Sequence, residues 1–170
     1  QLFARTRDPE VELVFVRAQD IPDLVAKGAV DLGVTGHDLV EESGSDVVEL
    51  LDLGYGLARI IVATHEKSGI KKSEDAKPGM RVATEFPRLA KRYFLEKGVK
   101  VEIVRVTGAA EITPLMGVAD LIVDVTSTGT TLRTHGLEIV DTILESSARL
   151  IANPKSLREK KSKIEGIVTA

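Results

Sequence analysis

Apolar positions along the chain fall into two kinds of segment that alternate from one end to the other. Short runs rich in Val, Ile and Leu predict buried strands, and segments with helical spacing, bounded by Gly, Pro and Asp, separate them. Helices are predicted at 20–28, 37–42, 87–97 and 111–116, with a last one from 154, and strands at 11–17, 30–34, 47–53, 57–64, 81–84, 99–106, 121–123 and, in one or two pieces, 137–151. Strands that alternate with helices predict an α/β protein with mostly parallel sheets flanked by helices.

One stretch of this pattern occurs twice. Residues 20–34 run acid, Ile, Pro, Leu, Gly, Asp and Leu into a buried strand, and residues 111–123 repeat that order with a different helix length. The repeat predicts two similar lobes. We expect residues 1–63 with 147–170 to form lobe I and residues 64–146 to form lobe II, which carries the second copy. The pattern shows no strand ahead of the first predicted one, so lobe I is expected to lack an N-terminal strand.

The most distinctive polar segment follows the predicted strand at 121–123. Asp124 ends this strand, and a loop around Gly129 offers backbone N–H groups and several Thr and Ser hydroxyls, which are donors that hold phosphate. The loop has neither the Gly-Lys-Ser/Thr of a Walker A motif nor the spacing of a dinucleotide loop. It indicates a sugar-phosphate site, with Asp124 on ribose hydroxyls or a metal ion. The alternative is a polar strand-to-helix turn with good N-caps.

Composition narrows the classes of function. The chain has 170 residues, 43% of them apolar, and a net charge of −3, so no bulk attraction to nucleic acid or to an anionic membrane is expected. Only 4% of residues are aromatic, which argues against a stacking surface for single-stranded nucleic acid. The absence of Cys excludes disulfides and thiolate chemistry, and three widely spaced His form no metal-ligand pattern. Without a membrane-length apolar run or a secretory signal, a cytoplasmic location is expected.

Six motifs in a fixed order make the chain resemble the catalytic region of the ATP phosphoribosyltransferase family. They lie at 17–22, 28–36, 52–59, 82–87, 108–111 and 117–132. The resemblance implies a two-lobed fold similar to type II periplasmic binding proteins. It also implies the first reaction of histidine biosynthesis, in which N1 of ATP attacks C1 of phosphoribosyl pyrophosphate with Mg²⁺ present. A homodimer or larger homo-oligomer, and a regulatory domain or regulatory partner subunit, are implied as well.

The resemblance further implies roles for individual residues. Phosphoribosyl pyrophosphate would contact Asp124, Thr126, Ser127, Thr128, Gly129, Thr130, Thr131 and Glu111, and the nucleotide would contact Arg17, Asp20 and Arg59. No acid, base or metal ligand is assigned. Three of these residues have structural alternatives: Glu111 could complement a helix dipole, Asp20 could cap a helix, and Arg59 could form a surface ion pair.

Two other classes of protein fit part of the pattern. A two-lobed small-molecule or anion binding protein without catalysis would share the fold, but the phosphate-type loop and the missing signal peptide count against it. A type I phosphoribosyltransferase would carry paired acids before its Thr-Gly loop, whereas Val125 follows Asp124 here. The basic segment after Pro154 is expected to be a solvated helix face.

Overall fold

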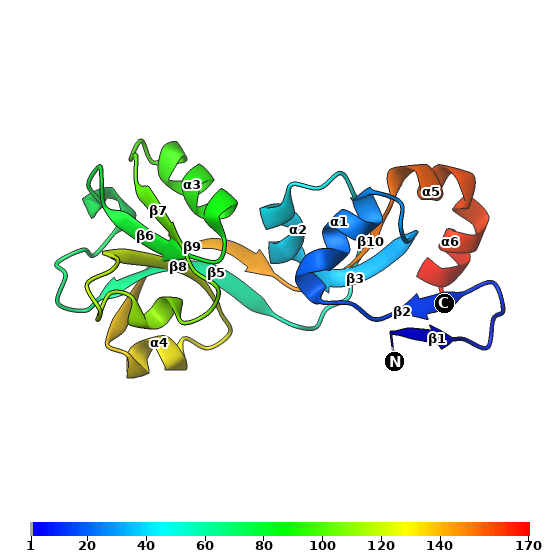
Figure 1. The fold of residues 1–170 in the computed structure, drawn as a ribbon, viewed down its shortest axis with the longest axis horizontal. Coiled ribbons are helices and arrows are strands. Elements are labelled where there is room, and N and C mark those ends of the chain that lie inside the picture. Colours follow the sequence, from blue (N-terminus) through cyan, green and yellow to red (C-terminus); the bar gives the residue numbers. More distant parts are fainter. Residues whose placement is uncertain (1) are drawn as a thin grey trace. The chain divides into compact units, whose positions relative to one another are not determined.

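The computed structural model describes residues 2–170, which divide into two compact units (Figure 1). Unit 1 comprises the chain up to Leu53 together with Ala148–Ala170, and unit 2 comprises Gly54–Ser147. The first boundary therefore lies at 53/54, whereas the sequence pattern places it at 63/64. The reason is β5 (Ala58–His65), which pairs along its length with two strands of unit 2.

Unit 1 contains a three-stranded sheet and a separate hairpin. Its elements are β1 (Phe3–Arg5), β2 (Glu12–Val14), η1 (Ala18–Asp20), α1 (Ile21–Ala26), β3 (Leu32–Gly36), α2 (His37–Ser43), β4 (Val48–Asp52), β10 (Ala148–Ala152), α5 (Pro154–Glu159) and α6 (Lys161–Val168). β10 lies between β3 and β4 and runs antiparallel to both. Val25 of α1, Val40 of α2 and Ile151 of β10 form the core of this unit.

Unit 1 contains one strand that the pattern does not predict, and its predicted parallel pairing is wrong. The sequence pattern shows no strand ahead of the first predicted one, yet β1 lies there and pairs antiparallel with β2, Phe3 opposite Val14. The three-stranded sheet is antiparallel, although the pattern predicts mostly parallel sheets. Its central strand, β10, comes from the far end of the chain and runs against both neighbours. Alternation of apolar positions carries no information about the direction of pairing, which the hydrogen-bond ladder sets.

The basic segment at the end of the chain forms α5 and α6, and much of its charge is paired within unit 1. Lys160 Nζ lies 3.1 Å from Asp31 Oδ1. Lys163 contacts Asp8, and its Nζ also lies 3.2 Å from Glu10 Oε2. These pairs are solvent-exposed, so the expectation of a solvated helix face is confirmed, and the segment is not a continuous cationic patch. Within residues 2–170, no helix combines the length and apolar character needed to cross a membrane.

Unit 2 is a five-stranded sheet with strand order β7-β6-β8-β5-β9. Besides β5, its elements are η2 (Ser73–Asp75), β6 (Arg81–Thr84), α3 (Pro87–Glu96), β7 (Glu102–Arg105), η3 (Ala110–Ile112), β8 (Leu121–Thr126), α4 (Thr130–Thr134) and β9 (Leu137–Ser146). β6 runs parallel to β7 and β8, whereas β5 runs antiparallel to β8 and β9. The α/β class is confirmed, with parallel pairing limited to this part of the sheet.

The two faces of this sheet are covered by different helices (Figure 1). On one face Ile61 of β5 and Ile122 of β8 pack in a core cluster with Leu132 of α4 and Leu137 of β9. Helix α3 lies along the opposite face, where Leu89 is fully buried. The polar end of β8 continues the α4 face.

Candidate functional site

The candidate site begins at the end of β8, which extends further than the sequence pattern predicts. The strand reaches Thr126 instead of ending at Asp124, because β5 pairs with it to that point. Side chains alternate along a strand, so Ile122, Asp124 and Thr126 share one face of the sheet. Ile122 belongs to the core under α4. Asp124 and Thr126 therefore form a polar continuation of a buried apolar face.

The hydroxyl-rich segment connects this strand end to α4. Residues 127–129 form the loop, and Gly129 adopts a positive φ of +77°. The Gly129 N–H donates to Thr126 Oγ1 at 3.0 Å, which ties the loop to the strand. The remaining predicted phosphate contacts follow in order, with Ser127 and Thr128 in the loop and Thr130 and Thr131 in the first turn of α4.

A cation that sequence reasoning missed lies at the same loop. Arg133, in the last turn of α4, donates from Nη2 to Thr130 Oγ1 at 3.4 Å. Thr128 Oγ1 donates to Thr130 Oγ1 at 3.0 Å, so the guanidinium and two hydroxyls form one cluster. The sequence could have indicated this contact, because Thr130 and Arg133 are three residues apart and such residues are neighbours on a helix. The loop thus offers a cationic donor in addition to backbone and hydroxyl donors.

Asp124 has an unusual environment for a carboxylate. Burial raises its pKa to about 6, because the ionised form loses hydration. The Val125 N–H donates to Asp124 Oδ1 at 2.8 Å and opposes this effect. The carboxylates of Glu111 and Glu85 add to the rise in pKa through repulsion. Two further carboxyl groups thus act electrostatically on Asp124 beside the hydroxyl loop.

Glu85 was not among the residues predicted from the sequence, but the sheet accounts for its position. β6 runs parallel to β8, with Thr84 opposite Val123, so the next residues of both strands, Glu85 and Asp124, follow at the same edge. Ligands of α/β proteins bind at such carboxyl ends. Glu85 directly follows the strand predicted at 81–84, and this position in the sequence could have indicated it as a site residue.

Glu111 lies in η3, whose entry has an uncommon backbone conformation. The residue before this turn, Ala109, has φ +54° and ψ +27°, which is the left-handed region. Such a conformation is rare for a residue with a side chain and tends to occur at functional sites. The predicted helix at 111–116 is reduced to a 3-10 turn over Ala110–Ile112, followed by turns in which the Met116 N–H donates to Ile112 O at 3.1 Å and the Gly117 N–H donates to Pro114 O at 3.2 Å.

Arg59 reaches the same face of the sheet from β5. Its Cα pairs directly with Thr126 across the antiparallel ladder, and Ile61 pairs with Asp124. Directly opposed side chains lie on one face, so Arg59 belongs beside the end of β8. Its Nη1 donates to Thr142 Oγ1 at 3.3 Å, a neutral partner that leaves the positive charge uncompensated by this contact.

The other two predicted nucleotide contacts, Arg17 and Asp20, lie in unit 1. Arg17 Nε and Asp20 Oδ2 form an ion pair at 3.2 Å, and the side chain of Arg17 is 75% exposed. Asp20 occupies the N-cap position of α1, as its alternative role requires, but its side chain makes no capping hydrogen bond there. Its carboxylate faces the guanidinium instead.

Unit 1 also holds a cluster of His37, Glu41 and Glu49, in which one ligand atom from each lies within 4.8 Å of the others. The spacing of the three histidines along the chain does not predict this cluster. His37 Nδ1 lies 2.6 Å from Glu49 Oε1, and Arg149 Nη1 lies 2.8 Å from Glu49 Oε2. Because Arg149 already supplies a positive charge to Glu49, the geometry is that of a salt-bridge network.

Comparison with known proteins now identifies the family. The family model described as ATP phosphoribosyltransferase matches residues 17–170. This chain belongs to the ATP phosphoribosyltransferase family. An ATP phosphoribosyltransferase from Methanopyrus kandleri is 56% identical over 154 residues, covering 91% of this chain and 54% of the relative. One from Methanocaldococcus jannaschii is 53% identical over 173 residues, covering 99% and 60%. The chain thus spans somewhat more than half the length of these relatives.

The fold of this chain is similar to those of several solved structures. The chain matches a chain of the ATP phosphoribosyltransferase HisG:HisZ complex from Thermotoga maritima with a TM-score of 0.89 and 29% identity, covering 99% of this chain and 80% of the other. The periplasmic aliphatic sulphonate binding protein SsuA from Escherichia coli matches with a TM-score of 0.62 and 18% identity, covering 92% and 59%. The likeness to SsuA concerns the fold alone, and it confirms the predicted resemblance to periplasmic binding proteins.

Proposed function

We propose that the protein containing this chain is an ATP phosphoribosyltransferase that transfers the phosphoribosyl group of phosphoribosyl pyrophosphate to N1 of ATP. The products are phosphoribosyl-ATP and pyrophosphate, and the reaction opens histidine biosynthesis in the cytoplasm. The observation that carries the proposal is the end of β8, where the partly buried Asp124 adjoins the loop at 127–129. Membership of the family supports the same reaction.

The residues of unit 2 suit a sugar phosphate. The ionised carboxylate of Asp124 would accept hydrogen bonds from ribose hydroxyls, while the loop and the first turn of α4 would donate to the 5-phosphate. Arg133, which already donates to Thr130, would add a positive charge there. Two anchored ends of one ribose hold C1 in place for an in-line attack by a nitrogen, and such positioning is a large share of catalysis in group transfer.

We propose that a magnesium ion is held jointly by one or two carboxylates of this region and by substrate phosphates. Asp124, Glu111 and Glu85 supply hard oxygen donors near a phosphate loop, and Mg²⁺ is commonly held by one or two carboxylates together with substrate phosphates. When bound, Mg²⁺ would stabilise the negative charge of the leaving pyrophosphate. The same ion would favour the ionised form of Asp124, whose pKa is otherwise raised to about 6.

For the nucleotide we propose Arg17, Asp20 and Arg59. Arg17 presents a largely exposed guanidinium whose carboxylate partner, Asp20, would orient it toward a triphosphate. Arg59 would meet phosphate charge at the end of β5, beside Thr126. We further propose a homo-oligomer with a regulatory domain or partner subunit. Relatives longer than this chain and the HisG:HisZ complex of Thermotoga maritima support that arrangement.

The reaction is tested on the full-length protein with ATP, phosphoribosyl pyrophosphate and Mg²⁺. Ultraviolet absorbance would follow phosphoribosyl-ATP, and a coupled assay would follow pyrophosphate. We expect product only when both substrates and the metal are present. If neither substrate binds and no product forms, the proposal fails, and a binding protein without catalysis becomes the better assignment.

Arg59→Ala tests the assignment of the nucleotide site. We expect the affinity for ATP to fall about tenfold or more, because a charge-assisted phosphate contact is lost, with a smaller effect on phosphoribosyl pyrophosphate. Titration calorimetry of the full-length variant with each substrate separately measures both affinities. The reverse preference would assign Arg59 to the pyrophosphate of the sugar substrate instead.

A further inference from the structure

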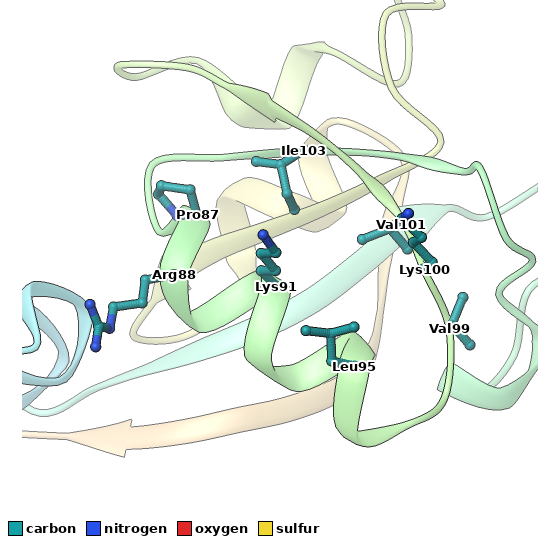
Figure 2. Close-up of a pocket in the computed structure, with 8 residues that line it drawn as sticks. All are labelled: Pro87, Arg88, Lys91, Leu95, Val99, Lys100, Val101 and Ile103. Atoms are coloured by element: carbon teal, nitrogen blue, oxygen red, sulfur yellow. The ribbon is translucent and has the colours of Figure 1, made fainter.

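Unit 2 carries an apolar groove between α3 and the segment that leads into β7 (Figure 2). The groove has a volume of about 470 Å³. Pro87 and Leu95 of α3 line one side, and Val99, Val101 and Ile103 line the other. Leu95 is 58% exposed, so its side chain is accessible at the groove. The groove lies outside the candidate phosphoribosyl site.

Two lysines, Lys91 and Lys100, lie at this apolar lining, whereas the guanidinium of Arg88 points away from it (Figure 2). No carboxylate contributes to the lining. Among residues 2–170, neither Lys91 nor Lys100 forms an ion pair. Since the whole chain carries a net charge of −3, this concentration of positive charge is local. The groove is complementary to a ligand that is both apolar and anionic.

The groove also borders an open edge of the sheet. β7 is the end strand of the five, and among the described strands it pairs with β6 alone. The Glu102 N–H donates to Met80 O at 2.8 Å and the Val106 N–H to Thr84 O at 3.0 Å, both toward β6. Strand alternation then directs the backbone N–H and C=O of Ile103 and Arg105 away from β6. These groups can receive another strand, and Ile103 lines the groove at the same place.

We propose that this groove is a docking site for an extended, acidic segment of a partner protein. The segment would add to β7 as a further strand through the outward backbone groups of Ile103 and Arg105. Its branched apolar side chains would enter the groove against Leu95 and Val101, and its carboxylates would meet Lys91 and Lys100. Strand addition gives affinity through main-chain hydrogen bonds, while pockets for alternate side chains give specificity.

An extended peptide satisfies all three features, whereas other occupants satisfy fewer. A small amphiphilic anion would match the apolar lining and the cations but would leave the backbone groups of Ile103 and Arg105 unused. The exposed edge strand also favours a partner that covers it, because natural proteins seldom leave such an edge available.

The probe for this site is a blocked, fluorescent heptapeptide that alternates Val with Glu, and its matched control carries Lys in place of every Glu. Anisotropy with the full 170-residue chain measures binding, and amide chemical shifts locate it. We expect the acidic peptide to bind, with shifts confined to α3 and β7, and to weaken as salt is raised. The basic peptide should bind at least about tenfold more weakly.

Two variants separate the contributions to binding. Lys91→Glu reverses one exposed charge and should weaken the acidic peptide about tenfold, whereas Lys67→Glu, outside the groove, should not. Ile103→Pro removes an outward N–H without removing a ladder bond and should abolish binding, whereas Ile103→Val should retain it. Circular dichroism checks that each variant is folded.

Three results would overturn the proposal. Equal affinity for the acidic and basic peptides would remove the charge complementarity. Binding of decanoate at the groove without peptide binding would assign it to small amphiphilic anions. Self-association of the chain that Ile103→Pro abolishes, with no peptide binding, would assign the groove to a second copy.

Discussion

At the scale of single residues, Asp120 and Asp124 are two aspartates separated by three buried residues. The pKa of one is lowered and that of the other is raised. The Arg81 N–H donates to Asp120 Oδ2 at 2.8 Å, and this bond holds the pKa of Asp120 below its usual value. Burial raises the pKa of Asp124 to about 6. The difference arises because Asp124 is buried and has carboxylates nearby, whereas a backbone donor from β6 reaches Asp120. Asp120 is thus stabilised as a carboxylate by a hydrogen bond within the fold, whereas burial disfavours the carboxylate form of Asp124.

Asp124→Asn should make the 170-residue chain more stable at neutral pH. A carboxyl whose pKa is raised in the folded state, here to about 6, binds its proton more tightly there than in the unfolded chain. Its contribution to stability is therefore present below the unfolded pKa and is lost as pH rises through about 6. Allowing for partial exposure, we expect a gain of about 1–2 kcal/mol at pH 8 that shrinks toward pH 4, measured by urea unfolding.

Asp120→Asn is the matched control with the opposite sign. Its lowered pKa gives stability that is present above the unfolded pKa and lost as pH falls through the folded one. This variant should be destabilised at pH 8 and approach the parent protein in acid. If both variants respond to pH in the same direction, the electrostatic account of Asp124 is wrong.

At the scale of elements, the segment from β8 through Gly129 to α4 depends on a tight backbone turn. Gly129 is the N-cap of α4, and its φ of +77° lies in the left-handed region. A Cβ added there would lie 3.3 Å from Arg133 Nη1 and 3.4 Å from Ile139 Cδ1. The turn therefore needs glycine both for its backbone conformation and for the approach of Arg133.

Gly129→Ala should destabilise the chain by about 1–2 kcal/mol, because a left-handed backbone is costly for a residue with a Cβ. In the full-length protein it should also weaken phosphoribosyl pyrophosphate binding, by displacing the guanidinium of Arg133. Urea unfolding and titration calorimetry measure the two effects. Gly166→Ala is the control, since Gly166 lies inside α6 with nothing within 4 Å of an added Cβ. That change should stabilise by about 0.5–1 kcal/mol.

At the scale of the whole molecule, the two units differ in how much of each is continuous in sequence. All five strands of the larger sheet come from Gly54–Ser147. The smaller sheet needs β10, which follows that segment in the chain, between β3 and β4, which precede it. Unit 1 can therefore complete its sheet only after unit 2 has been synthesised, and only unit 2 is a continuous folding unit.

A polypeptide of residues 54–147 should fold by itself, because its sheet, its core under α4 and the covering helix α3 all lie within it. We expect a cooperative unfolding transition and a dispersed amide spectrum. Residues 2–53 alone should remain largely unfolded, because the central strand of their sheet is absent. A disordered fragment 54–147 would show that unit 2 requires unit 1 for its stability.

The sequence by itself determined the alternation of strands and helices, the family, and the Asp124 loop, because these depend on local spacing and on residues adjacent in the chain. Only the tertiary structure decided the antiparallel sheet of unit 1, the acid Glu85 beside Asp124, and the capping alternative for Asp20. The physical reason is common to all three. A strand's direction, a carboxylate's neighbours and a side chain's hydrogen-bond partner are set by groups that chain folding brings together, and periodicity does not record them.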